Sequence, residues 1–466
     1  MKRIPVFLIM TFLLLIVVLG CGGSEPAGSI EERGPTHFCL VDPCIGYEVD
    51  LAVEPEAETD NVEAENHNNN TATNTRNAVD TQEGPAVEKD SLDNTDYHLG
   101  FDFNLFHEIA VNNPDKNVII STVSIKLALA MAYNGASGEA KEAIARVVQI
   151  EGLSLEEVNQ KLHDMMTSLE AADTDVQVEI ANSVWSHTGI SLYKDFIGRC
   201  REYYDAEVES LDFFDPASVD IINKWVDEKT HGKIKKIIKS FEGEIYALIN
   251  ALYFKGFWTS QFNEYATREA DFHLPNGEVK KVPLMWQKGM FPYYENQDFQ
   301  AISLPYGDKR MSMYIFLPKP EKNFDVFIAS LNAGDWSSWM PDFSIKKGII
   351  ELPHMQTGYF VNLRDTLESL GMGPVFSGNA LEGMSATPLD IKRILHKTVL
   401  EVNEAGTEGA AVTYIGGPTC APNPEELFEM RVDRPFFLAI RDNLTGELLF
   451  MGSIIDPLTN EDQPGL

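Results

Sequence analysis

The sequence contains residue types that catalyse reactions, but their spacing forms no familiar catalytic motif. The 10 histidines are scattered, and none lies in an HExxH pattern that would place two zinc ligands on one helix face. Neither a GxxxxGKS/T phosphate loop nor a GxGxxG dinucleotide loop occurs. Gly135-Ala136-Ser137-Gly138 is not a GxSxG nucleophile elbow and is predicted to be a turn between two helices. Cys200 and Cys420 lack a histidine nearby in sequence, and Cys200 is predicted to be a partly buried thiol. We expect no enzyme, cofactor or metal site.

A long segment after Asn403 suits a different role, in which one half could add to a sheet as a strand and the other half is offered to a protease. A connection of roughly 20 to 30 residues inside a compact domain is usually functional or disordered. Its first half carries small or β-tolerant residues at alternate positions, which fit the inward face of a strand added between two others: Thr407, Gly409, Ala411 and Thr413. Its second half pairs poorly in a sheet and should stay exposed to proteases because of Gly416, Gly417, Pro418, Pro422 and Pro424. A flexible loop without a role is the alternative.

The N-terminus has the pattern of a secretory signal over residues 1–20. Lys2 and Arg3 precede an apolar run that ends at Gly20-Cys21. Val18-Leu19-Gly20-Cys21 resembles a prokaryotic lipobox, in which the cysteine is lipidated and becomes the new first residue. An uncleaved membrane anchor is the alternative. Both predict an extracytoplasmic protein, in the cell envelope or secreted, and the lipid would be its only attachment to the membrane.

Residues 21–96 are predicted to be a disordered acidic spacer. Residues 22–96 contain 18 acidic and 3 basic side chains and few large apolar ones. Such a chain cannot offset its ordering entropy by burial. Cys39 and Cys44 flank Asp42-Pro43 and could close a small disulfide loop in an oxidising compartment. Two unpaired thiols are the alternative, and a metal site is disfavoured because two further ligands are not evident nearby.

The remaining chain is predicted to be one α+β domain over residues 97–457, followed by a short tail at 458–466. The 466 residues carry a formal net charge of -34, which argues against nucleic-acid binding, since that needs a basic face. Helical periodicity dominates up to about residue 240, as in Tyr97, Phe101, Leu105 and Ile109. Strand patterns dominate afterwards, and the predicted strands include 117–121, 176–186, 246–254, 311–317, 350–354 and 435–454.

Several long blocks of this domain resemble the serpin family, in the family's order and over essentially all of residues 97–457. The segment Glu404–Thr413 resembles the hinge of a serpin reactive-centre loop. The other similar blocks are NVIISTVSIKLALAMAYNGASGEAKEAI (117–144), AEVESLDF (206–213), INKWVDEKTHGKIKKII (222–238), ALINALYFKGFWTSQF (247–262), HKTVLEVNEAGTEGAA (396–411) and RPFFLAIRDNLTGELLFMGSIIDP (434–457).

The resemblance implies a serpin fold, with a large mixed central β-sheet, two smaller sheets, about eight or nine helices and an exposed reactive-centre loop near 404–430. It also implies a suicide-substrate mechanism. A serine endopeptidase cleaves the loop, and at the acyl-enzyme stage the hinge inserts into the large sheet and drags the protease with it. Trapping is then a race between insertion and deacylation. The metastable protein is expected to act as a monomer.

The resemblance assigns roles residue by residue. The hinge pattern is kept by Glu404, Gly406, Thr407, Glu408, Ala410 and Ala411, whereas Gly409 stands where the family usually has alanine. Fixing a glycine there costs about 0.5–1 kcal/mol more than fixing alanine. Ser121, Ser124, Asn250 and His396 match a polar cluster beneath the opening of the sheet, and Trp258 matches the tryptophan near the entry point. Thr122 replaces the family's common proline.

The attacked bond is expected at Cys420-Ala421, with Thr419-Cys420 as the next choice. Counting the family's usual spacing from Glu404 gives the first bond, whereas counting back from Pro435 points nearer Pro424. A small residue there suits an elastase-like or subtilisin-like serine protease rather than a trypsin-like one. A cysteine protease is a second class of target. The competing interpretations are a non-inhibitory serpin acting as a binding or structural module, a solute-binding lipoprotein and a hydrolytic enzyme.

Overall fold

A computed structural model describes residues 95–376, 379–389, 391–407 and 427–458. The described residues form nine α-helices and two mixed β-sheets, which matches the expected α+β class. None of these helices is both long enough and apolar enough to cross a membrane. The helices are α1 (Thr95–Val111), α2 (Thr122–Gly135), α3 (Gly138–Val147), α4 (Leu155–Glu170), α5 (Lys194–Tyr204), α6 (Ala217–Lys229), α7 (Phe324–Ser330), α8 (Ala333–Trp339) and α9 (Arg364–Leu367).

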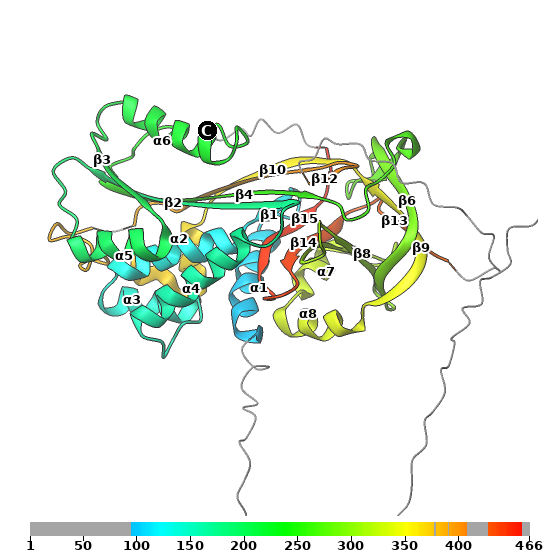
Figure 1. Cartoon of the computed structure of the whole chain (residues 1–466), viewed down its shortest axis with the longest axis horizontal. Helices are drawn as coiled ribbons and strands as arrows, with labels where there is room; N and C mark the ends of the chain where they lie inside the picture. Colours follow the sequence, from blue (N-terminus) through cyan, green and yellow to red (C-terminus); the bar gives the residue numbers. More distant parts are fainter. Residues whose placement is uncertain (1–94, 377–378, 390, 408–426, 459–466) are drawn as a thin grey trace, which may run out of the picture. The chain divides into compact units, whose positions relative to one another are not determined.

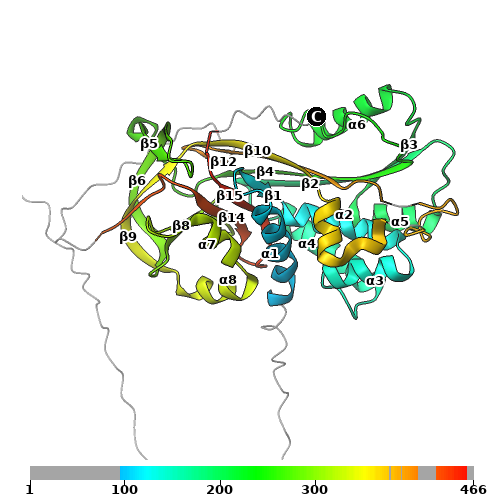
Figure 2. The same cartoon turned by 180° about the vertical axis from the view of Figure 1, so that it is seen from behind.

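The six-stranded sheet lies between two helical layers. Its strand order is β10 (Met355–Asn362), β11 (Leu395–Val402), β12 (Gly406–Thr407), β4 (Tyr246–Phe257), β2 (Val176–His187) and β3 (Glu207–Leu211). Only β2 and β3 are parallel, whereas the other neighbours pair antiparallel. Figures 1 and 2 show α6 over one face of this sheet and α2, α4 and α5 against the other.

The second sheet contains nine strands. Its order is β1 (Val118–Ile120), β15 (Leu448–Ile454), β14 (Phe436–Asp442), β8 (Met311–Pro318), β7 (Phe299–Pro305), β6 (Val279–Glu295), β9 (Ser344–Pro353) and β13 (Phe428–Arg431), and β5 (Arg268–His273) pairs with β6. The resemblance to serpins implies two smaller sheets beside the large one. They are continuous here because β6 spans 17 residues, so it pairs with β5 and β9 over most of its length and with β7 at its end.

Most predicted strands and helices are present, but the bounds of two strands and the burial of Cys200 need correction. The stretch 435–454 is two strands rather than one, because the chain reverses between β14 and β15 at Gly446, whose φ is +85°. The stretch 350–354 is the end of β9, which begins at Ser344. Cys200 is fully buried rather than partly buried, and burial raises the pKa of its thiol to about 12, so this thiol is chemically quiet.

The elements begin and end where local chemistry predicts. Ser121 caps α2 by accepting a hydrogen bond from the Ser124 N–H. The turn predicted at residues 135–138 separates α2 from α3, and its Gly138 has a φ of +50°, which suits glycine. Every residue of β8 is buried, as its continuous apolar sequence predicts.

Candidate functional site

The first two residues of the expected inserting strand already lie inside the six-stranded sheet. Gly406 and Thr407 form β12, which is antiparallel to both β11 and β4. Thr407 is opposite Val402 on one side and Gly256 on the other. A tight turn connects β11 to β12, because the N–H of Asn403 donates to Gly406 O at 2.9 Å. The hinge (residues 404–411) therefore enters the sheet at its third residue.

Thr407 is held at this entry by a buried aromatic pair. Its side chain faces the interior, is 3% exposed, and its Oγ1 lies 2.6 Å from the Tyr306 hydroxyl. Tyr306 stacks on Trp258, with 4.5 Å between the ring centroids. The Trp258 indole N–H donates to Asn403 O at 3.0 Å, and its backbone N–H donates to Ala405 O at 2.9 Å. Burial raises the Tyr306 pKa, so this hydroxyl stays protonated and can donate.

Glu404 anchors the chain immediately before the hinge enters the sheet. Its Oε1 accepts a hydrogen bond from Thr267 Oγ1 at 2.6 Å and lies 2.8 Å from His354 Nε2. Its backbone oxygen accepts a hydrogen bond from the Phe262 N–H at 2.9 Å. Burial raises the pKa of Glu404, but the hydrogen bonds from Thr267 and His354 outweigh it and leave the pKa below its ordinary value. The carboxylate is therefore ionised and fixes where the hinge begins.

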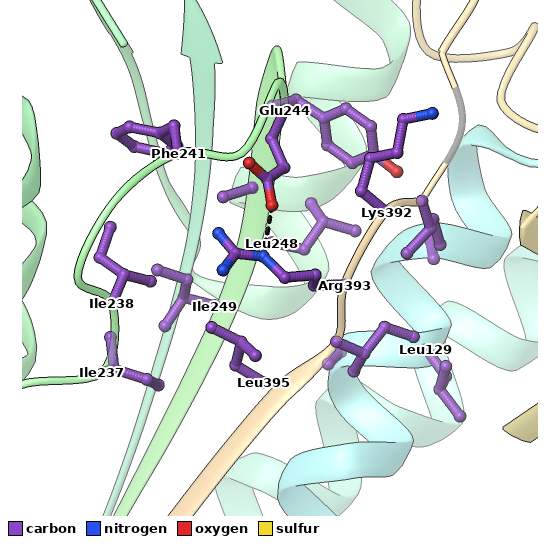
Figure 3. Close-up of a pocket in the computed structure, with 16 residues that line it drawn as sticks. Leu129, Ile237, Ile238, Phe241, Glu244, Leu248, Ile249, Lys392, Arg393 and Leu395 are labelled. Atoms are coloured by element: carbon purple, nitrogen blue, oxygen red, sulfur yellow. Dashed lines mark hydrogen bonds and ion pairs between the residues drawn. The ribbon is translucent and has the colours of Figure 1, made fainter. Parts of the chain in front are cut away.

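Between β4 and β11 the described residues leave a strand position that only Gly406 and Thr407 enter, and we call this position the slot. Among the described residues, no backbone pairing joins β4 directly to β11. Two cavities lie along this gap. The one next to β12 is called the upper cavity, and the one at the start of β4 and β11 is called the lower cavity. The upper one is lined by Ile234, Leu252, Phe254, Leu400, Thr407 and Phe450. The lower one is lined by Leu129, Ile238, Phe241, Leu248, Ile249 and Leu395 (Figure 3). In the order of the sheet, the slot has the same place as β12, of which the structure describes Gly406 and Thr407.

Three of the four predicted cluster residues lie together where β11 contacts the start of α2. The Ser121 N–H donates to His396 Nε2 at 3.0 Å, and the Ser121 hydroxyl accepts from the Ser124 N–H. Complete burial lowers the pKa of His396 to about 3, so the imidazole is neutral and its Nε2 accepts. Thr122 donates its hydroxyl proton to Leu448 O at 2.6 Å, and so fixes the start of α2 by a hydrogen bond.

Asn250 lies on the opposite wall of the slot. Its amide nitrogen donates to Asn182 Oδ1 across the β2–β4 pair at 2.6 Å. Its Oδ1 is buried and has no hydrogen-bond partner among the described residues. A buried carbonyl without a donor costs free energy in this state of the protein. A state in which a donor reaches it would avoid that cost.

Several predicted site residues lie outside the described residues: Cys21, Cys39, Cys44, Glu408, Gly409, Ala410, Ala411, Thr419, Cys420 and Ala421. The structure adds four residues that the sequence analysis did not select. Asn182 is a polar residue within a predicted apolar strand, which is a usable signal. No local pattern marks Tyr306, Thr267 or His354, because their roles depend on partners about 50 to 140 residues away.

The sequence is similar to serpins from distant organisms. A family model described as serpin (serine protease inhibitor) matches residues 97–457. An uncharacterised serpin-like protein of Thermococcus kodakarensis is 36% identical over 366 residues, covering 77% of this chain and 84% of that protein. Leukocyte elastase inhibitor of Bos taurus is 32% identical, covering 77% of this chain and 97% of that protein. Neuroserpin of Homo sapiens is 30% identical, covering 76% and 90%.

Solved structures agree with the sequence comparison. The native state of tengpin, a thermophilic serpin, has a TM-score of 0.72 and 29% identity, and the match covers 78% of this chain and 94% of that one. Thyroxine-binding globulin in complex with thyroxine has a TM-score of 0.71 at 24% identity, covering 78% and 99%, and supports the fold alone. The chain belongs to the serpin family.

Proposed function

We propose that this serpin inhibits serine endopeptidases by a suicide-substrate mechanism. The observation that carries the proposal is the slot, a strand position between β4 and β11 that, in the part of the chain the structure describes, only Gly406 and Thr407 enter. A loop cleaved beyond the hinge could extend β12 into this position. The new strand would pair with both walls, and the backbone hydrogen bonds gained would drive the movement.

The register of β12 indicates which residues would enter the slot. Continuing the antiparallel pairing places residues 408–417 opposite Lys255 to Tyr246 of β4. Because Thr407 faces inward, residues 409, 411, 413 and 415 would also face inward. Three of these four are glycine, alanine or threonine, so little side-chain volume must be accommodated until Ile415.

Thr413 has a defined destination in this register. The pairing places it between Asn250 of β4 and His396 of β11. Its hydroxyl could donate to Asn250 Oδ1, which is buried without a partner among the described residues. The inserted state would then satisfy a polar atom that the present state leaves unpaired.

The proposed attacked bond is Cys420-Ala421, with Thr419-Cys420 as the next choice. A protease with a small, apolar specificity pocket would accept these residues, so we propose elastase-like or subtilisin-like enzymes as targets. A cysteine protease is a second class, since it also forms an acyl-enzyme with the loop. A non-inhibitory binding role is less well supported, because it gives no purpose to a slot that begins at the hinge.

The test incubates the purified full chain with an elastase-like, a subtilisin-like and a trypsin-like protease and then denatures it in SDS. A band near the summed mass, with a released C-terminal fragment that begins near Ala421, would support covalent trapping. Cleavage with a raised melting temperature but no adduct would mean that insertion loses the race with those enzymes. Cleavage with neither adduct nor stabilisation would overturn the proposal and favour a binding role.

We also propose that Cys21 carries a lipid that attaches the protein to the outer side of a cytoplasmic membrane. The lipobox-like Val18-Leu19-Gly20-Cys21 supports this, and residues 22–96 would act as a spacer. Cys21→Ser should move the protein from the detergent phase to the aqueous phase in a phase-partition experiment. Unchanged partitioning would favour an uncleaved anchor instead.

A further inference from the structure

The segment between α6 and β4, residues 230–245, lies along the slot and is called the strap. Its side chains line both cavities, with Ile234 in the upper one and Ile237, Ile238 and Phe241 in the lower one. Ile234, Ile237 and Ile238 are buried in an apolar cluster that also contains Trp185 of β2 and Ile249 of β4. The strap therefore covers the slot on the side of α6, whereas Leu129 of α2 lies on the other side (Figure 3).

Three polar cross-links attach the strap to β11. Lys233 Nζ lies 2.7 Å from Glu401 Oε2. Lys397 Nζ donates to the backbone oxygen of Lys236 at 3.1 Å. Arg393, just before β11, donates to the backbone oxygen of Ser240 at 2.9 Å. The three partners on the β11 side are residues 393, 397 and 401. They recur every fourth residue, and positions with this spacing share one face of an extended chain. Since the strap continues into β4, these cross-links tie the two walls of the slot together.

Arg393 makes the most extensive of these contacts. In addition to Ser240 O, its guanidinium pairs with Glu244 and lies 3.4 Å from Glu242 Oε1. The Arg393 side chain is 22% exposed and that of Glu244 is 9% exposed, so this pair is better shielded from solvent than Lys233–Glu401. Glu244 lies two residues before β4, and Arg393 lies two residues before β11. The pair therefore joins the two walls where β4 and β11 begin, at the end of the slot far from β12 (Figure 3).

We infer that Arg393 is a latch that limits how fast an inserting strand fills the lower half of the slot. The inference rests on the proposed function, because it concerns the insertion step. If insertion continues the register of β12, Tyr414 would reach Ile249 and Leu395, and Ile415 would reach Leu248. These positions are next to the latch, whereas residues 408–412 reach only the upper part of the slot. The early part of insertion is then independent of Arg393, whereas the late part must displace the strap where Arg393 holds it.

The test uses two synthetic peptides and needs no protease. One has the sequence of residues 408–417 and reaches the latch, and the other has the sequence of residues 408–413 and ends above it. Each carries fluorescein, and its association with the full chain is followed by anisotropy. Arg393→Met should accelerate binding of the long peptide about tenfold, which corresponds to a barrier lower by about 1.4 kcal/mol. The short peptide should bind at the wild-type rate.

Two further variants separate the latch from general destabilisation. Lys281→Met removes an exposed ion pair with Asp271 in the nine-stranded sheet and should leave both rates unchanged. Glu244→Gln keeps Arg393 and weakens its main contact, so it should also accelerate binding of the long peptide. It replaces Arg393→Met as the test variant if Arg393→Met does not fold. Equal acceleration of both peptides, or no acceleration of the long one, would overturn the latch while leaving insertion intact. Failure of both peptides to bind any variant would overturn the insertion proposal itself.

Discussion

His396 connects β11 to the start of α2, and its protonation would break that connection. Its buried Nε2 accepts the Ser121 N–H, and burial lowers its pKa to about 3. In an unfolded chain the pKa is about 6.5. Between these values only the unfolded chain binds the proton, so this contribution to stability is fully present above pH 6.5 and is lost as pH falls toward 3. From pH 7 to pH 5 the free energy of unfolding should fall by about 2 kcal/mol from this group.

Thermal unfolding at pH 7.5, 6 and 5 measures this effect. His396→Asn removes the titrating group, so its melting temperature should depend less on pH than that of the wild type, even if it is lower at pH 7.5. His273→Asn changes an exposed histidine and is the control that should keep the wild-type slope. Parallel slopes in the wild type and His396→Asn would contradict the prediction.

Thr413 provides a second test at the scale of one atom. Thr413→Val keeps the shape of the side chain but removes the hydroxyl that is proposed to reach Asn250 Oδ1 in the inserted state. Leaving that buried oxygen unpaired should lower the stability of the loop-cleaved protein by about 1–3 kcal/mol. The uncleaved protein should unfold as the wild type does. Unfolding of both forms in guanidinium chloride checks this, and Thr413→Ser, which keeps the hydroxyl, should behave nearly as the wild type.

At the scale of elements, the sequence predicts where strands and helices form better than which other elements they contact. The strands β2, β4 and β8 follow from runs of apolar and β-branched residues, and α1 follows from a four-residue apolar repeat. Contacts between distant strands do not follow from such patterns. Thr407 meets Tyr306 across 101 positions, and Ser121 meets His396 across 275. The resemblance to serpins supplied the Ser121–His396 cluster, but nothing local predicted Tyr306.

The hinge shows the same limit. Alternating small residues predicted a strand that could insert, yet the position at which insertion already begins depends on the register between β12 and its neighbours. That register is set by the turn at Asn403 and by the Thr407–Tyr306 contact. Only the fold brings those groups together.

Gly406 allows β12 to approach β4, and this gives a prediction about the element. Its φ is +154°, and an added Cβ would lie 2.0 Å from the backbone oxygen of Gly256, so a side chain cannot fit without moving the strand. Gly406→Ala should expel β12 from the sheet and make insertion start later. The ratio of covalent adduct to merely cleaved, unbound inhibitor should then fall several-fold in the SDS gel experiment. Gly373→Ala is the matched control, because open space surrounds that position. An unchanged ratio in Gly406→Ala would show that the preinserted hinge is irrelevant to trapping.

The joint between α1, α2 and the β14–β15 turn depends on one buried cation. Lys126 Nζ lies 2.9 Å from Asp102 Oδ2 and 3.0 Å from Glu447 Oε2, and the side chains of Lys126 and Asp102 are at most 5% exposed. Burial raises the pKa of Asp102 to about 7 although Lys126 opposes this. Lys126→Met leaves two carboxylates close together without a cation, which should cost about 3–5 kcal/mol of stability.

Melting temperatures check this second element. Lys126→Met should melt well below the wild type, and adding Asp102→Asn should restore part of the loss because one buried carboxylate is then neutral. Lys224→Met breaks an exposed pair with Glu228 and should change stability by less than about 0.5 kcal/mol. A Lys126→Met variant as stable as Lys224→Met would contradict the assigned role.

At the scale of the whole molecule, the two sheets differ in completeness. In the described residues of the nine-stranded sheet, each strand pairs with its neighbour in the order, whereas the six-stranded sheet contains the slot between β4 and β11. Among the described residues, only Gly406 and Thr407 pair with the edges of β4 and β11 that face this gap. Unpaired strand edges are costly and invite the addition of another strand. The proposed insertion would therefore add backbone pairs to one of the two sheets and leave the other unchanged.

Hydrogen exchange across the whole domain tests this distribution. Before cleavage, amides of β4 and β11 that face the slot should exchange faster than amides of β8 and β14, which pair on both sides. After cleavage of the loop, exchange in β4 and β11 should slow because residues 408–417 would supply hydrogen-bond partners. Exchange in β8 and β14 should change little, so those strands serve as the internal control. Fast exchange restricted to the slot walls, followed by protection after cleavage, would tie the sheet's incompleteness to insertion. Equal protection of both sheets before cleavage would mean that the walls are already closed in solution, and the cleaved loop would then have to break existing pairs before it could form new ones.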